Sequence, residues 1–98
     1  MRFLATNVVL HDLIVTELLE QKSLAALIYL INCGRELEFN VNDKQYFISR
    51  DKAEKYVSIW DKINEQSFDS VAELIENAII GDKPFLSVWK DVEIETLF

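Results

Sequence analysis

Cysteine and glycine are scarce in this chain of 98 residues, and the scarcity of each excludes a class of functional site. Cys33 is the single cysteine, so no disulfide can form within the chain and no multi-cysteine metal site is available. The two glycines, Gly34 and Gly81, belong to no glycine-rich loop, which excludes a phosphate-binding loop. A lone thiol in an otherwise ordinary chain indicates the reducing cytoplasm as the location.

Basic residues are also few. Lys and Arg total 10 against 17 Asp and Glu, which gives a net charge of −7. Contacts to nucleic-acid phosphates need clustered Lys and Arg, so we expect no nucleic-acid partner. An acidic surface suits solubility, or docking onto a basic protein.

Long apolar runs are missing too. The longest clean run, Leu24 to Ile31, has eight residues, whereas a membrane-spanning helix needs about 20. Residues 1–6 look like the start of a signal peptide, but His11, Asp12 and Glu17 interrupt the apolar stretch and no small-residue cleavage site follows. We therefore expect neither a signal peptide nor a membrane partner.

The clearest predicted element is an amphipathic helix over residues 70–80. Ser70 and Glu73 have the spacing of a capping box, with Asp69 as the competing cap. Gly81 suits the left-handed residue that follows the last helical turn. The apolar stripe of this helix comprises Val71, Leu74, Ile75, Ala78 and Ile79.

The first 35 residues read as helical. Thr6 or Asn7 can cap a helix that runs to about Gln21, and Ser23 can cap a second one, although the pattern also allows a single long helix. Residues 1–22 are a possible N-terminal extension. One apolar face of the first helix comprises Leu10, Leu13, Ile14 and Leu18. This face either packs on the rest of the domain or makes a homodimer through residues 1–30.

Residues 36–49 are predicted to form a β-hairpin. Asn42 and Asp43 stand where a two-residue type I′ turn requires positive φ. The resulting register sets three cross-strand pairs, which are Leu37 with Ile48, Phe39 with Tyr46 and Val41 with Lys44. The other face of this hairpin carries Glu38, Asn40 and Phe47.

Tyr56–Asp61 is predicted to be a third strand, by its β-branched and aromatic content. We favour the facing that buries Trp60, because burying an indole stabilises more than burying a valine. The opposite facing buries Val57 and Ile59 and leaves an exposed aromatic patch beside Phe47. Residues 62–67 are expected to be a loop.

The remaining elements are a short helix over residues 85–90 and a final strand over residues 92–98 at the sheet edge. The predicted fold over residues 1–98 is a single α+β domain. It has an N-terminal helix or helix pair, a three-stranded antiparallel meander, the capped helix, the short helix and the C-terminal strand, with the helices on one side of a small sheet.

No residue pattern predicts a catalytic, cofactor-binding or metal-binding residue. His11 has no second ligand at helical spacing on its face. Cys33 falls in the last turn of a helix, where the negative end of the helix dipole disfavours a reactive thiolate, so we expect a small buried residue and not a nucleophile.

Charge is the one surface feature with functional content. Residues 61–98 contain nine acidic residues and three lysines, a net of −6 out of the total of −7. Such a surface suits a basic partner, because charge raises association rate and specificity. The residues predicted to bind it are Asp69, Glu73, Glu76, Asp82, Glu93 and Glu95.

Four stretches carry a resemblance: Gly34-Arg-Glu-Leu-Glu-Phe39, Lys44-x-Tyr-x-Ile-Ser49, Phe68-Asp-Ser-Val-x-Glu-Leu74 and Gly81-x-Lys-Pro-x-x-x-x-Trp-x-Asp-Val-Glu93. Together they resemble a loose group of small uncharacterised proteins from Gram-positive bacteria and their mobile elements, over about residues 22–98. That group tends to have Asn-Gly at the hairpin turn, and the first 20 residues here look like an addition. The resemblance implies a shared fold and no activity.

The leading functional hypothesis is a non-enzymatic, acidic protein-interaction module, such as an inhibitor or immunity-type factor of a mobile element. A second hypothesis is a small hydrolase or metal-dependent enzyme that uses converging carboxylates. A third is a structural homodimer without a ligand.

Overall fold

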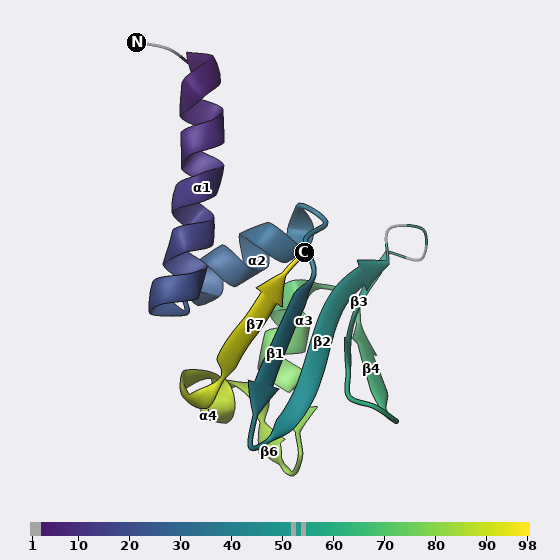
Figure 1. The fold of residues 1–98 in the computed structure, drawn as a ribbon. Helices are drawn as coiled ribbons and strands as arrows, with labels where there is room; N and C mark the ends of the chain where they lie inside the picture. Colours follow the sequence, from purple (N-terminus) through teal and green to yellow (C-terminus); the bar gives the residue numbers. More distant parts are fainter. Residues whose placement is uncertain (1–2, 52, 54) are drawn as a thin grey trace.

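The computed structural model describes the backbone of residues 3–51, 53 and 55–98, and the side chains of those residues from Leu10 onward (Figure 1). Its helices are α1 (Phe3–Gln21), α2 (Leu24–Asn32), α3 (Val71–Asn77) and α4 (Phe85–Val88), followed by a 3-10 turn (Trp89–Asp91). Its strands are β1 (Leu37–Val41), β2 (Lys44–Asp51), β3 (Tyr56–Trp60), β4 (Glu65–Phe68), β5 (Ile79–Ile80), β6 (Lys83–Pro84) and β7 (Glu93–Leu97). None of these helices is both long and apolar enough to cross a membrane.

Five strands form one antiparallel sheet in the order β4-β3-β2-β1-β7, so the last strand pairs with the first. The predicted α+β class is confirmed. The hairpin is confirmed as well, because Asn42 and Asp43 have φ angles of 53° and 62° and the three predicted cross-strand pairs form. Local turn chemistry was sufficient there, since a two-residue turn determines the register of the strands beside it.

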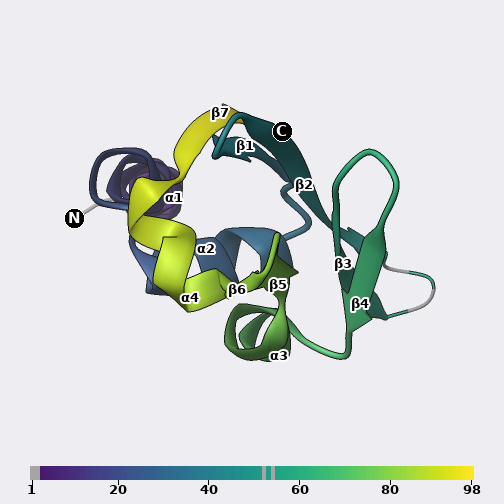
Figure 2. The ribbon, with the colours of Figure 1, turned by 90° about the horizontal axis from the view of Figure 1, so that it is seen from below.

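Helices α2, α3 and α4 lie against one face of the sheet, and the core fills the space between (Figure 2). Phe39 lies at its centre. Its ring stacks on Tyr46 at 5.6 Å and meets Phe85 and Trp89 edge-on at 6.5 and 6.2 Å. Each such aromatic or aliphatic side chain stabilises the fold by about 1.5–3 kcal/mol through burial.

The N-terminal segment is two helices rather than one. Lys22 has a left-handed φ of 52°, which interrupts the helix, and the Ser23 hydroxyl accepts from the Ala26 amide at 3.1 Å to begin α2. The Lys22 carbonyl also accepts from the Trp89 indole at 2.8 Å, which anchors this corner to the domain. From that corner α1 extends away from the sheet (Figure 1).

Two predicted boundaries are wrong. Residues 65–68 are the strand β4 rather than part of a loop, and the capped helix ends at Asn77 instead of Ile80. The Gln66 side chain explains both, because its amide donates to the Ile79 carbonyl and accepts from the Ile79 amide, at 2.7 and 2.9 Å. These two bonds hold Ile79 extended, so the last predicted helical turn is replaced by the β5–β6 hairpin, with Gly81 at its turn (φ 67°).

The favoured facing of the third strand is also wrong. Val57 and Ile59 are buried, while Trp60 is 41% exposed. Ile59 lies opposite Ile48, whose side chain is in the core, so strand pairing places Ile59 on the covered face and Trp60 on the other. Pairing with β2 decides the facing, and the size of the indole does not.

Candidate functional site

The sheet has one face that the described helices leave uncovered, which we call the open face (Figure 2). Side chains alternate between faces along a strand, so the positions that alternate with the buried apolar residues of each strand project here. The outward positions are Glu38, Asn40, Gln45, Phe47, Ser49, Asp51, Tyr56, Ser58, Trp60, Glu65, Ser67, Glu93, Glu95 and Thr96.

All the charged outward positions of these five strands are acidic, namely Glu38, Asp51, Glu65, Glu93 and Glu95. The two basic residues of the strands, Lys44 and Arg50, both fall on the opposite register. Arg50 donates to the Asn32 side chain of α2 at 3.1 Å, on the covered side. The strands therefore segregate charge by register, and the outward strand positions carry only negative charges.

Two aromatic residues lie opposite each other on this face. Phe47 on β2 lies directly opposite Trp60 on β3, and Phe47 also meets the Phe98 ring edge-on at 5.9 Å. The exposed aromatic patch that the sequence allowed as the alternative facing is thus present.

Glu65 is held in place beside Trp60 by two hydroxyls. Ser58, only 2% exposed, donates to Glu65 Oε2 at 2.7 Å, and Ser67 Oγ lies 3.2 Å from the same oxygen and 2.9 Å from Ser58 Oγ. A second carboxylate is also positioned, because the Gln45 amide reaches across β1 and donates to Glu95 Oε1 at 2.8 Å. These bonds preorganise two acidic groups of the open face.

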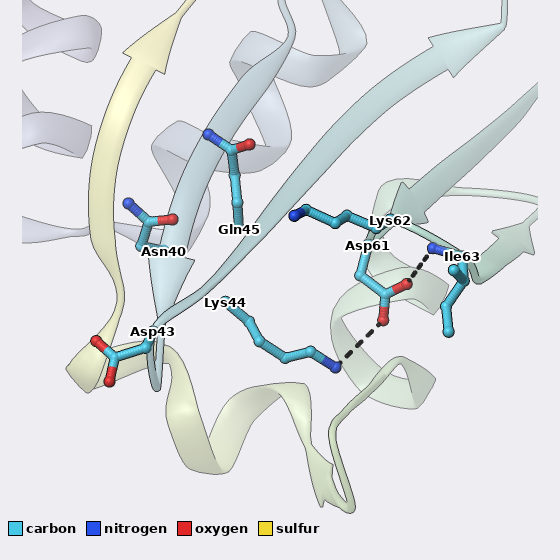
Figure 3. Close-up of a pocket in the computed structure, with 7 residues that line it drawn as sticks. All are labelled: Asn40, Asp43, Lys44, Gln45, Asp61, Lys62 and Ile63. Atoms are coloured by element: carbon cyan, nitrogen blue, oxygen red, sulfur yellow. Dashed lines mark hydrogen bonds and ion pairs between the residues drawn. The ribbon is translucent and has the colours of Figure 1, made fainter.

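A cleft of about 510 Å³ lies at one end of the sheet, between the β1–β2 turn and the β3–β4 loop (Figure 3). Asp61 organises its loop side. Its carboxylate accepts from the Ile63 and Asn64 amides at 2.9 and 2.8 Å, and it pairs with Lys44 at 3.7 Å. The two backbone amides, and to a lesser extent the Lys44 charge, lower the pKa of Asp61. The cleft is lined by Asn40, Asp43, Lys44, Gln45, Asp61, Lys62 and Ile63.

Two described cations, Lys62 and Arg35, belong to segments at opposite ends of the open face. Lys62 is in the β3–β4 loop, and its side chain reaches across the cleft toward Gln45 (Figure 3). Arg35 precedes β1 at the other end, where its Nε donates to the Phe98 carbonyl and its Nη1 lies 2.9 Å from His11 Nε2. Because a guanidinium only donates, His11 accepts in this contact. His11 therefore links α1 to Arg35, and Arg35 in turn links it to the C-terminal residue Phe98.

The structure separates the six residues predicted to bind a partner into two groups. Asp69, Glu73 and Glu76 are exposed around α3, and Asp82 is exposed in the β5–β6 turn. Helix α3 covers the opposite face of the sheet, so these four do not join Glu93 and Glu95 on the open face. The sequence did not predict Trp60 and Glu65 as residues of a binding surface, because Trp60 was expected in the core and Glu65 in a loop.

The predicted self-association residues also divide. Leu10 and Leu13 are 51% and 60% exposed on α1, and Ile14 packs partly against the core. Leu18 is fully buried, so it cannot contribute to a surface in this arrangement. Cys33 is exposed, contrary to the expectation of a small buried residue, because it caps α2 at the surface.

Within the part of the chain that the structure describes, no group of three or more His, Cys, Asp or Glu side chains is arranged to hold a metal ion. Comparison with protein-family models, with curated proteins and with solved structures found no match.

Proposed function

We propose that this protein is a non-enzymatic binding module that docks on a basic protein through its open face. The observation that carries the proposal is the segregation of charge in the sheet, in which all five charged outward positions are acidic and neither strand cation occupies an outward position. Negative charge on one face steers a positive partner and rejects a negative one. The Phe47–Trp60 pair supplies the apolar centre that a stable interface needs, with the acidic groups as its rim.

A module of this kind suits an inhibitor or immunity-type factor, which covers the basic surface of an enzyme. A mobile-element origin, as the resemblance implies, is in keeping with such a role. We also place the protein in the cytoplasm, where the exposed thiol of Cys33 stays reduced.

The proposal predicts that the carboxylates of the open face, and not those around α3, bind the partner. Two variants that each remove three negative charges test this prediction. Glu38→Gln/Glu93→Gln/Glu95→Gln neutralises three acids of the open face, and Asp69→Asn/Glu73→Gln/Glu76→Gln neutralises three around α3. Both are used with the native protein for affinity capture from the host lysate, at low and at high ionic strength.

We expect basic proteins that the native protein and the α3 variant retain at low salt, and that the open-face variant loses. Loss with the α3 variant alone would instead assign binding to the acidic surface of α3. If both variants lose the basic proteins equally, the binding depends on net charge alone and not on one face. If both variants retain them, neither group of acidic residues forms the interface.

A second candidate, a homodimer through residues 1–30, has one observation in its favour. Leu10 and Leu13 are 51% and 60% exposed on a helix that extends away from the sheet (Figure 1). Neighbouring exposed leucines on one helix are typical of a surface that binds another chain. The described residues offer no observation that favours the carboxylate-based hydrolase or metal-dependent enzyme.

A further inference from the structure

One row of side chains crosses the open face at right angles to the strands. Glu38 on β1 is opposite Phe47 on β2, Phe47 is opposite Trp60 on β3, and Trp60 is opposite Glu65 on β4. Directly opposed residues on one face have Cβ atoms about 4.5–5.5 Å apart, so each side chain begins beside the next. The row therefore places two aromatic rings between two carboxylates.

Trp60 is the more accessible of the two aromatic rings in this row. Trp60 is 41% exposed although its strand lies between β2 and β4, whereas Phe47 meets the ring of Phe98. The face of an indole attracts cations more strongly than any other side-chain ring. Next to it, Ser58 and Ser67 hold the Glu65 carboxylate in one position.

We infer that this row is a subsite for an arginine side chain of the basic partner, an inference that rests on the proposed function of the open face. A guanidinium can stack flat on Trp60 while its edge donates to the carboxylate of Glu65. A lysine ammonium is a compact, strongly hydrated charge that cannot make both contacts with the same geometry.

Charge complementarity selects this occupant over the others. A second copy of the same face would bring carboxylates against carboxylates, because the outward positions of the described strands contain no Lys or Arg. The α1 helix of a second copy is no better, since Phe3–Gln21 also contains no Lys or Arg. A nucleic-acid phosphate would be repelled by the row.

The test compares labelled nona-arginine and nona-lysine peptides, titrated by fluorescence anisotropy at low ionic strength. We expect the native protein to bind the arginine peptide about two- to five-fold more tightly, the range that a cation–π contact at an exposed indole provides. Trp60→Leu keeps the net charge and removes the ring, so it should abolish the preference. Tyr29→Leu is the matched control, because it removes an equally exposed ring from α2, outside the sheet.

Nuclear magnetic resonance on the native protein gives a readout that does not depend on a variant folding. The chain has two tryptophans, and Trp89 is buried with its indole N–H bonded to the Lys22 carbonyl. The arginine peptide should shift the indole N–H signal of Trp60 and leave that of Trp89 in place.

Four outcomes would overturn the inference: equal affinity for the two peptides, a preference that survives Trp60→Leu, an unmoved Trp60 signal, or a preference lost equally in Tyr29→Leu. Salt-sensitive binding of both peptides without preference would overturn the arginine subsite and leave the acidic docking face standing. No binding of either peptide at low salt would contradict the docking face as well.

Discussion

Phe47 and Trp60 lie directly opposite each other on neighbouring strands, and both side chains project from the face of the sheet that the described helices leave uncovered. This pair defines the centre of the proposed binding surface. It also makes the facing of β3 the most informative feature to test first.

Substitutions at two consecutive residues of β3 should have very different effects on stability. Ile59→Ala removes a fully buried side chain and should lower the free energy of unfolding by about 2–5 kcal/mol. Trp60→Thr removes only cross-strand contacts on the open face and should cost less than about 1 kcal/mol. Urea unfolding followed by circular dichroism measures both, and a larger loss for Trp60→Thr would contradict the facing described above.

The bidentate contact of Gln66 predicts a local effect on the β5–β6 hairpin. Gln66→Ala removes both bonds to Ile79 and should lower the free energy of unfolding by about 1–3 kcal/mol. The Ile79 amide loses its acceptor, so its hydrogen exchange should accelerate. Gln45→Ala is the control, since it breaks a side-chain bond to Glu95 elsewhere and should leave the Ile79 exchange rate unchanged.

Acidification should lower the free energy of unfolding through the protonation of Asp61, which lies in the loop that lines the cleft. The folded-state pKa of Asp61 is lowered below its usual value of 3.8, chiefly by the Ile63 and Asn64 amides. The ionised carboxylate therefore contributes stability that is complete above that value and is lost as the pH falls through the lowered pKa. Asp61→Asn does not titrate, so the stability difference between the native protein and this variant should narrow below pH 3.8.

Paired unfolding curves at several pH values measure this difference. A gap that stays constant or widens on acidification would show that Asp61 is not stabilised as a carboxylate. Lys44→Met should alter the profile only slightly, because the Lys44 charge contributes less to the lowered pKa than the two backbone amides do.

Self-association through α1 is open to a direct measurement of mass. If the second candidate holds, the native protein sediments as a dimer at micromolar concentration and Leu10→Lys/Leu13→Lys sediments as a monomer. Leu86→Lys places a charge on an equally exposed leucine of α4 and should leave the dimer intact. A native protein that stays monomeric throughout the concentration range would rule out this dimer.

The sequence by itself determined the features that depend on a few neighbouring residues. Asn42 and Asp43 take the positive φ angles of a tight turn, and the hairpin register follows from the turn alone. Ser23 and Ser70 cap α2 and α3 as their spacing predicts, because a cap involves backbone groups only three residues away. The hydrophobic pattern also identified most of the core and the α+β class.

Tertiary structure decided everything that required two distant segments to meet. The end of α3 and the existence of β4 depend on Gln66 bonding to Ile79, 13 residues away. The facing of Trp60 depends on pairing with β2, and Glu93 and Glu95 join the acidic outward positions only because β7 pairs with β1. A local sequence pattern predicts which residues can lie on the same face of a strand. Strand pairing, whose hydrogen bonds link residues far apart in the chain, determines which of these faces is buried.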